Sequence, residues 1–220
     1  MKSLDIETIP NIAMIDKLPA PKVAYGNTKD PEKRAVLEAE AKKDQIDKMA
    51  LNPFYGRLAA YALIGLMGNM SDYLHVDTDE DEMRLVYDLL KELRQGGTQT
   101  NPLCTFNGNN FDLPYIYKRA MILRVEMPER CPPLKYWTKR YGNPSHYDLM
   151  QELCKLGAPG GYTSLDEAAS VILGKRKNER DYKTYGDLIR SGNGNQVRRD
   201  SLDDALLTIE LYNAVQKYLG

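Results

Sequence analysis

The stretch "LDIETIP" at residues 4–10 places two carboxylates one residue apart in a segment with the composition of a β-strand. Successive side chains of a strand point to opposite faces, so Asp5 and Glu7 share one face and Leu4 and Ile6 share the other. Two adjacent carboxylates repel each other unless a cation lies between them. The stretch therefore predicts a strand whose polar face helps to hold a divalent metal ion, with further ligands elsewhere in the chain.

Length and composition indicate an ordinary globular α/β protein. The chain has 220 residues, of which 42% are hydrophobic and 28% are charged, enough for one sizeable domain. Its net charge of −1 argues against purely electrostatic binding to nucleic acid and leaves local basic patches open. We therefore expect residues 1–220 to form a single domain.

The cysteine content and the N-terminus both favour a cytoplasmic protein. The three cysteines are widely spaced and contain no Cys-x-x-Cys pair, which argues against a zinc site and fits a reducing compartment. The sequence begins without a charged-then-apolar leader, and its longest apolar stretch is too short to cross a bilayer. We expect no membrane partner.

Strand and helix patterns alternate along the chain, which favours a mixed sheet covered by helices. The segment 29–51 has a good N-cap in Asp30 and few apolar positions, so it predicts a solvated helical arm or insertion at about 28–51. The other patterns predict strands at 1–9, 57–67, 71–76 and 101–106, and helices at 77–97, 111–123, 147–155, 164–173, 181–190 and 197–218.

Two more acidic signals follow the first. Asp112 begins a predicted helix after a strand that ends in Asn-Gly, and alone it is explained as a helix N-cap. Asp200 and Asp204 lie four residues apart on one face of the C-terminal helix, and alone they fit a solvated acidic face equally well.

Taken together and in order, "LDIETIP", "FNGNNFDLP" and "DDALLTIELY" resemble the motifs of the DEDD (DnaQ-like) 3′–5′ exonuclease superfamily. The resemblance is strongest to stand-alone relatives of the proofreading domain of B-family DNA polymerases, and it runs through most of the chain. It implies a ribonuclease-H-like fold, a mixed five-stranded sheet with helices on both faces.

The resemblance also implies a catalytic centre of four metal-binding carboxylates: Asp5, Glu7, Asp112 and Asp204. Hard oxygen ligands suit Mg²⁺ or Mn²⁺, and two such ions activate a water and stabilise the charged transition state of phosphodiester hydrolysis. The implied activity is release of nucleoside 5′-monophosphates from the 3′ ends of single-stranded DNA. Two alternatives are a weakened exonuclease fold that binds nucleic acid or protein, and an RNA exonuclease.

One position departs from the family pattern. Family members usually carry a Tyr or His four residues before the last metal-binding Asp, and this chain has Asp200 there. Asp200 is a candidate general base, an additional metal ligand, or a sign of reduced activity. Tyr182 and Tyr185 are candidate substitutes for the missing phenol, although nothing in the sequence places them.

Candidate substrate contacts come from the strand end, the second motif and a basic aromatic segment. Polar backbone beside Asp112 suits a terminal nucleotide, and interleaved aromatic and basic residues suit single strands. A second basic segment, "GKRKNERDYK", covers residues 174–183. For any one basic side chain, simple solvent exposure is the more economical explanation. The candidates are Thr8, Ile9, Asn107, Gly108, Asn109, Phe111, Lys118, Arg119, Trp137, Lys139 and Arg140.

Overall fold

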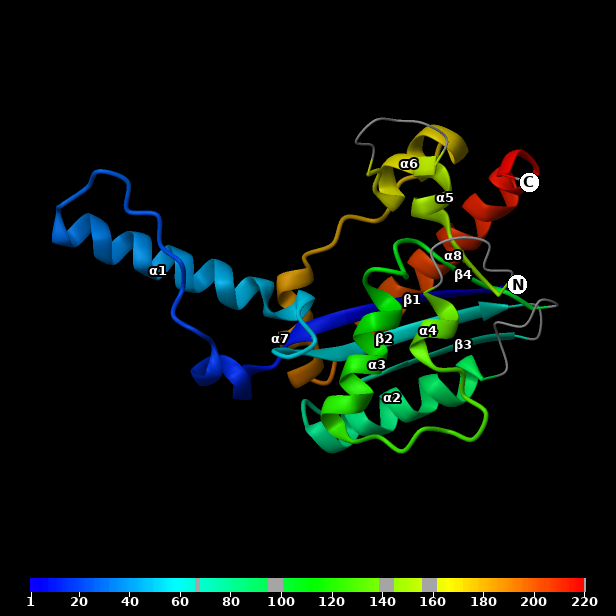
Figure 1. The fold of residues 1–220 in the computed structure, drawn as a ribbon, viewed down its shortest axis with the longest axis horizontal. Coiled ribbons are helices and arrows are strands. Elements are labelled where there is room, and N and C mark those ends of the chain that lie inside the picture. Colours follow the sequence, from blue (N-terminus) through cyan, green and yellow to red (C-terminus); the bar gives the residue numbers. More distant parts are fainter. Residues whose placement is uncertain (66–67, 95–100, 139–144, 156–161, 220) are drawn as a thin grey trace.

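A five-stranded mixed sheet forms the centre of the protein (Figure 1). The structure is a computed structural model that describes residues 1–65, 68–94, 101–138, 145–155 and 162–219. The sheet order is β3-β2-β1-β4-β5, antiparallel between β1, β2 and β3 and parallel between β1, β4 and β5. The strands are β1 (Lys2–Pro10), β2 (Gly56–Gly65), β3 (Gly68–Tyr73), β4 (Leu103–Thr105) and β5 (His146–Asp148).

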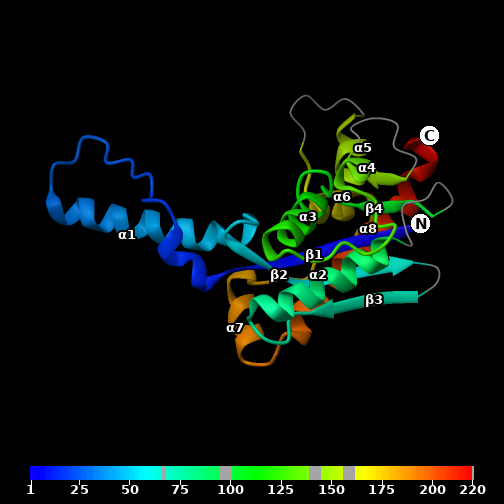
Figure 2. The same cartoon turned by 60° about the horizontal axis from the view of Figure 1, so that its bottom comes forward.

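Helices cover both faces of this sheet, as predicted. In Figures 1 and 2, α2 and α3 lie on one face and α8 on the other. The α-helices are α1 (Pro31–Asp47), α2 (Asp79–Leu93), α3 (Asp112–Leu123), α4 (Leu134–Trp137), α5 (Leu149–Lys155), α6 (Leu165–Leu173), α7 (Tyr185–Arg190) and α8 (Asn195–Leu219). Three 3-10 helices are η1 (Ile12–Lys17), η2 (Lys48–Leu51) and η3 (Tyr182–Thr184).

The two faces of β1 differ as the alternation of its sequence predicts. Leu4 and Ile6 are buried in the core cluster that includes residues of α2 and α3. Asp5 pairs across the ladder with Ala62 of β2, and Ala62 packs against Ala205 of α8. The acidic face of β1 is therefore the face that α8 covers, and this arrangement positions the candidate site.

The parallel pairing of β1 with β4 is short, and this leaves part of β1 open. β1 pairs with β4 only at Lys2 and Ser3, because β4 ends at Thr105. From Asp5 onwards, the edge of β1 on that side is available to the chain that follows β4. That chain is the second acidic motif, which leads into α3.

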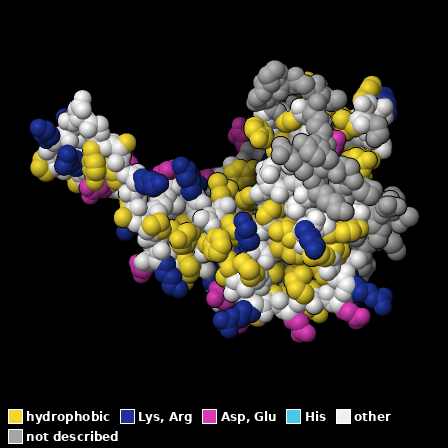
Figure 3. All heavy atoms as spheres, viewed as in Figure 1, with side chains coloured by type: hydrophobic (Ala, Val, Ile, Leu, Met, Phe, Trp, Pro, Cys, Tyr) yellow, Lys and Arg dark blue, Asp and Glu magenta, His cyan; other side chains and the backbone are white. Residues whose placement is uncertain are grey.

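The segment before β2 forms an arm, in line with its sparse apolar positions. Asp30 caps α1 by accepting from the N–H of Glu32, and Pro31 is its first residue. No residue of α1 is buried, and Figures 1 and 2 show it projecting beyond the end of the sheet. Basic, acidic and apolar side chains are interspersed along this arm (Figure 3). Local propensity and capping, and not core packing, account for this helix.

Three predicted boundaries are wrong. The strand predicted at 71–76 is β3 (Gly68–Tyr73), because the Asp81 carboxylate accepts from the N–H groups of His75 and Val76 and turns the chain into α2. The helix predicted at 147–155 begins as β5, which pairs with β4, and only then continues as α5. The helix predicted at 181–190 begins as η3. Within the part of the chain that is described, no helix is long and apolar enough to span a bilayer.

Candidate active site

Three of the four predicted metal-binding acids meet in one cluster. One carboxylate oxygen from each of Asp5, Glu7 and Asp204 lies within 4.8 Å of the others. β1 supplies the first two and α8 supplies the third. The hydroxyl of Ser201, three residues before Asp204, donates to the backbone carbonyl of Asp5 at 3.0 Å and fixes α8 against β1. Two distant segments of the chain thus form one acidic centre.

The chemistry of this cluster fits a hard divalent cation. Burial, and then the charges of Glu7 and Asp204, hold the pKa of Asp5 well above its usual value. Burial, and then the charge of Asp204, raise the pKa of Glu7 to about 8. Asp5 Oδ2 and Glu7 Oε1 are buried without a hydrogen-bond partner among the described residues. Unpartnered carboxylate oxygens in a shared site are the donors that Mg²⁺ and Mn²⁺ prefer.

Asp112, the fourth predicted metal-binding acid, lies beside the cluster of Asp5, Glu7 and Asp204 but is not part of it. It is buried at the first position of α3, and the N–H of Ile6 on the open edge of β1 stabilises its charged form. Burial nevertheless raises the pKa of Asp112 to about 7. Its charge contributes to the raised pKa of Asp5, so the two carboxylates are electrostatic neighbours.

The loop before Asp112 is fixed by a buried carboxylate of β5. Asp148 accepts from the backbone N–H of Asn107 at 3.0 Å and from that of Asn109 at 2.9 Å. Asn107 has a φ of 70°, and a side chain at Gly108 would overlap that of Thr105. Gly108 thus allows the loop to pack against Thr105, and its carbonyl accepts from the N–H of Leu113 at 3.1 Å, which holds the loop at the start of α3.

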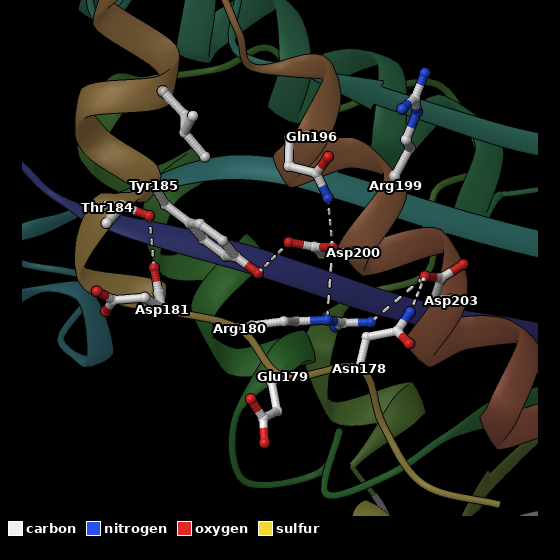
Figure 4. Close-up of a pocket in the computed structure, with 11 residues that line it drawn as sticks. Asn178, Glu179, Arg180, Asp181, Thr184, Tyr185, Gln196, Arg199, Asp200 and Asp203 are labelled. Atoms are coloured by element: carbon white, nitrogen blue, oxygen red, sulfur yellow. Dashed lines mark hydrogen bonds and ion pairs between the residues drawn. The ribbon is translucent and has the colours of Figure 1, made fainter.

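Asp200 is buried, and both of its carboxylate oxygens have partners. The hydroxyl of Tyr185 on α7 donates to Oδ2 at 2.7 Å, and the side-chain amide of Gln196 donates to Oδ1 at 3.0 Å. Arg180 Nε lies 3.5 Å from the same Oδ1. Figure 4 shows these three side chains converging on Asp200 at the wall of a cavity of about 510 Å³. Tyr185 is therefore the phenol closest to the departure from the family pattern.

Two cations at the acidic centre were not predicted individually. Lys177 forms an ion pair with Asp204 Oδ2, and Arg180 Nη1 lies 2.9 Å from Asp204 Oδ1. The Arg180 side chain is only 3% exposed. Both residues come from the basic segment 174–183, which is visible in the sequence as a charge run. The sequence does not reveal which of its side chains turn inward.

The predicted substrate contacts separate into accessible and buried residues. Lys118 is exposed on α3, and Thr8, Asn107, Asn109 and Phe111 are half-buried. Ile9 and Gly108 are buried. Lys139 and Arg140 lie outside the described residues.

Two predicted contacts, Arg119 and Trp137, are core residues. The guanidinium of Arg119 donates to both carboxylate oxygens of Glu82 at 2.7 Å. Trp137 is fully buried, and its indole N–H donates to the hydroxyl of Tyr117 at 2.8 Å. Side chains enclosed in this way are unavailable for phosphate binding or base stacking, so we do not propose them as substrate contacts.

Residues 54–220 match the sequence profile of a family described as a predicted 3′–5′ exonuclease related to the exonuclease domain of PolB. The chain belongs to this family. The matched region includes Asp112, Asp200 and Asp204, but it begins after Asp5 and Glu7. The structure nevertheless brings Asp5 and Glu7 next to Asp204, because β1 packs against α8.

Archaeal DNA polymerases are similar to this member of the PolB-exonuclease-related family. It is 27% identical to DNA polymerase 1 of Pyrococcus abyssi over 149 residues, which are 64% of this chain and 19% of the polymerase. It is 29% identical to DNA polymerase 1 of Aeropyrum pernix over 152 residues, 66% of this chain and 15% of the polymerase. The chain thus spans less than a fifth of the length of these relatives.

The fold agrees with that of a solved polymerase. The family B DNA polymerase of Pyrobaculum calidifontis superposes with a TM-score of 0.57 at 16% identity, over 99% of this chain and 24% of the polymerase chain. The ribonuclease-H-like architecture predicted from the three motifs is confirmed by this match and by the five-stranded sheet.

Proposed function

We propose that this member of the PolB-exonuclease-related family is a metal-dependent 3′–5′ exonuclease that releases nucleoside 5′-monophosphates from single-stranded DNA ends. One observation carries the proposal: half-buried Asp5 and buried Glu7 and Asp204 form an acidic cluster with oxygens that lack a hydrogen-bond partner among the described residues, in a chain of this family. A structural role alone does not account for three carboxylates gathered at such a cost in repulsion and burial.

The residues of the site divide the work of hydrolysis. Mg²⁺ or Mn²⁺ held by the cluster, with Asp112 beside it, supplies water activation and stabilises the negative charge of the transition state. We expect the loop at Asn107–Asn109 and the exposed Lys118 to contact the terminal nucleotide and its phosphate. Backbone N–H groups of β1 and α3 hold Asp112 in place, so the ligands stand on rigid elements.

A binding module is the second candidate, because Lys177 and Arg180 already offset part of the negative charge of the centre. Such a protein would hold nucleic-acid ends without cutting them. This alternative predicts that a labelled oligonucleotide binds in the presence of Mg²⁺ and that no shortened oligonucleotide forms.

The decisive experiment incubates the purified chain with a 5′-labelled 30-nucleotide single strand and Mg²⁺ or Mn²⁺. We expect a ladder that shortens from the 3′ end and nucleoside 5′-monophosphate as the small product. Asp5→Asn removes one metal-binding charge with little change in shape and is expected to lower the rate by at least about 100-fold. Asp16→Asn, on the exposed η1, is the matched control and is expected to cut at the wild-type rate.

If the oligonucleotide binds but stays full-length at high protein and Mn²⁺ concentrations, the exonuclease proposal is contradicted and the binding module is supported. An RNA strand of the same sequence identifies the sugar preference. Faster shortening of the RNA than of the DNA would contradict the DNA part of the proposal and favour the RNA exonuclease.

A further inference from the structure

The arginine at the acidic centre contacts the same oxygen atoms that a metal ion needs. Arg180 Nη1 lies 2.9 Å from Asp204 Oδ1 and 3.8 Å from Glu7 Oε1. Neither contact has hydrogen-bond geometry, so Nη1 and both oxygens lack a hydrogen-bond partner among the described residues. The guanidinium therefore acts on these two acids as a positive charge placed between them, which is how a bridging cation acts.

Arg180 is held in this position by acids behind it. Its Nε lies 3.5 Å from Asp200 Oδ1, and its Nη2 lies 3.7 Å from Asp203 Oδ2 (Figure 4). Asp200 is in turn oriented by Tyr185 and Gln196. The carboxylate found where the family pattern has a Tyr or His thus serves as an anchor for a buried arginine.

The charges at the centre leave a net negative charge for an additional divalent cation. Asp5, Glu7, Asp200 and Asp204 carry four negative charges when ionised, and Lys177 and Arg180 offset two of them. The charge of Asp112 raises the pKa of Asp5 and so adds to the negative charge of the centre, and Asp203 adds a further carboxylate beside Arg180. Negative charge therefore remains for a metal ion, and Asp5 Oδ2 is buried without a hydrogen-bond partner among the described residues.

We propose, on the basis of the proposed function, that Arg180 is a built-in cation that takes the place of one of the two metal ions implied by the family resemblance. The centre then binds one divalent ion, at Asp5 and Glu7. Asp200 is a positioning residue for Arg180 and is not a proton acceptor.

The test counts bound ions and does not depend on cleavage. Metal-free protein is titrated with Mn²⁺, and electron paramagnetic resonance of the free ion gives the number bound per chain. We expect one ion for the wild type and two for Arg180→Met, which keeps the length of the side chain and removes its charge. Arg180→Lys keeps the charge and is expected to bind one ion. If the methionine variant does not fold, two ions bound to the wild type or to Arg180→Lys would contradict the proposal.

Arg176→Met is the matched control. Arg176 lies on the same connection, but it is exposed and pairs with Asp166 away from the centre. We expect one ion for this variant, as for the wild type. Circular dichroism of each variant verifies the fold before titration.

Two ions in the wild type, or the same number in the wild type and Arg180→Met, would overturn the inference. The exonuclease proposal fails on a different observation, the absence of 3′ shortening. A protein that cuts DNA and binds two ions refutes only the role of Arg180. A protein that binds one ion without cutting refutes only the exonuclease.

Discussion

At the level of single residues, the contacts of Asp200 favour one of the interpretations that its sequence position leaves open. Its two oxygens accept from Tyr185 and Gln196 and face Arg180. Asp200→Asn keeps an acceptor oxygen at this position. We expect it to lower the exonuclease rate by no more than about tenfold and to leave the pH dependence of the rate unchanged. Loss of a general base would lower the rate further, by about 10²–10⁴-fold. Single-turnover rates across a pH series measure this, and a loss of several orders of magnitude would restore Asp200 as the base.

The buried Glu7 carboxylate gives a pH dependence to the stability of the metal-free protein. Its pKa in the folded protein is about 8, above the ordinary value of 4.5. The folded state therefore binds more protons than the unfolded chain between these values, and the free energy of unfolding falls as pH rises through this window. We expect EDTA-treated Glu7→Gln to melt several degrees above the wild type at about pH 8, since about 1 kcal/mol moves the midpoint by about 2–4 °C.

Differential scanning calorimetry at about pH 5 and pH 8 measures this effect. Glu210→Gln is the control, because Glu210 lies on the exposed surface of α8 and pairs with Lys175. Mn²⁺ should raise the midpoint of the wild type more than that of Glu7→Gln, since a ligand stabilises the state it binds. Equal midpoints for Glu7→Gln and wild type at about pH 8 without metal would contradict the expectation.

At the level of secondary structure elements, α3 carries two neighbouring basic residues with different roles. Arg119 is buried against Glu82 of α2, whereas Lys118 is exposed. We expect Arg119→Met to lower the free energy of unfolding by about 2–3 kcal/mol, because buried Glu82 loses two charge-assisted hydrogen bonds and keeps those from Arg57 and the N–H of Leu58. Lys118→Met is expected to leave the free energy of unfolding unchanged and to weaken binding of single-stranded DNA.

Urea unfolding and fluorescence-anisotropy titrations separate these two effects. Each variant serves as the control for the other, because the two residues are adjacent on the same helix. If folded Arg119→Met loses affinity for DNA and Lys118→Met does not, the expectation is contradicted, and Arg119 is a substrate contact as the sequence predicts.

The elements that sequence predicts well are those with a local pattern. The alternation of Leu4 and Ile6 with Asp5 and Glu7 is sufficient to predict β1 and its acidic face. Asp30 before Pro31 predicts the start of α1 in the same way. Positions that depend on distant partners are not predictable in this way. The sequence offers Arg119 as a candidate substrate contact, because its partner Glu82 lies 37 residues away and no local pattern links the two.

The acidic centre shows the same division. Its carboxylates lie in recognisable motifs, so Asp5, Glu7 and Asp204 were named from sequence and the structure brings them together. Arg180 lies in a run of charges that gives no indication of burial. Only the folded chain shows that it points at acids from β1 and α8. The division of residues 1–220 into domains stays a prediction.

At the level of the whole molecule, the arm and the sheet differ in how much packing protects them. No residue of α1 is buried, although most of the stability of a helix in a protein comes from tertiary packing. We expect brief trypsin treatment to cut between residues 22 and 43 before it cuts in β1, β2 or α8. Mass spectrometry of the first fragments identifies the cuts, and an arm that resists digestion as long as those elements would contradict this expectation.

The attachment of α8 to β1 has a consequence for the making of the protein. Ser201 is synthesised 196 residues after Asp5, and Asp204 follows it. A nascent chain therefore contains half of a cation-binding centre while the residues between these two segments are made. We expect ribosome-bound chains stalled before α8 to bind no Mn²⁺ tightly, so that any nuclease activity is withheld until translation has passed this helix.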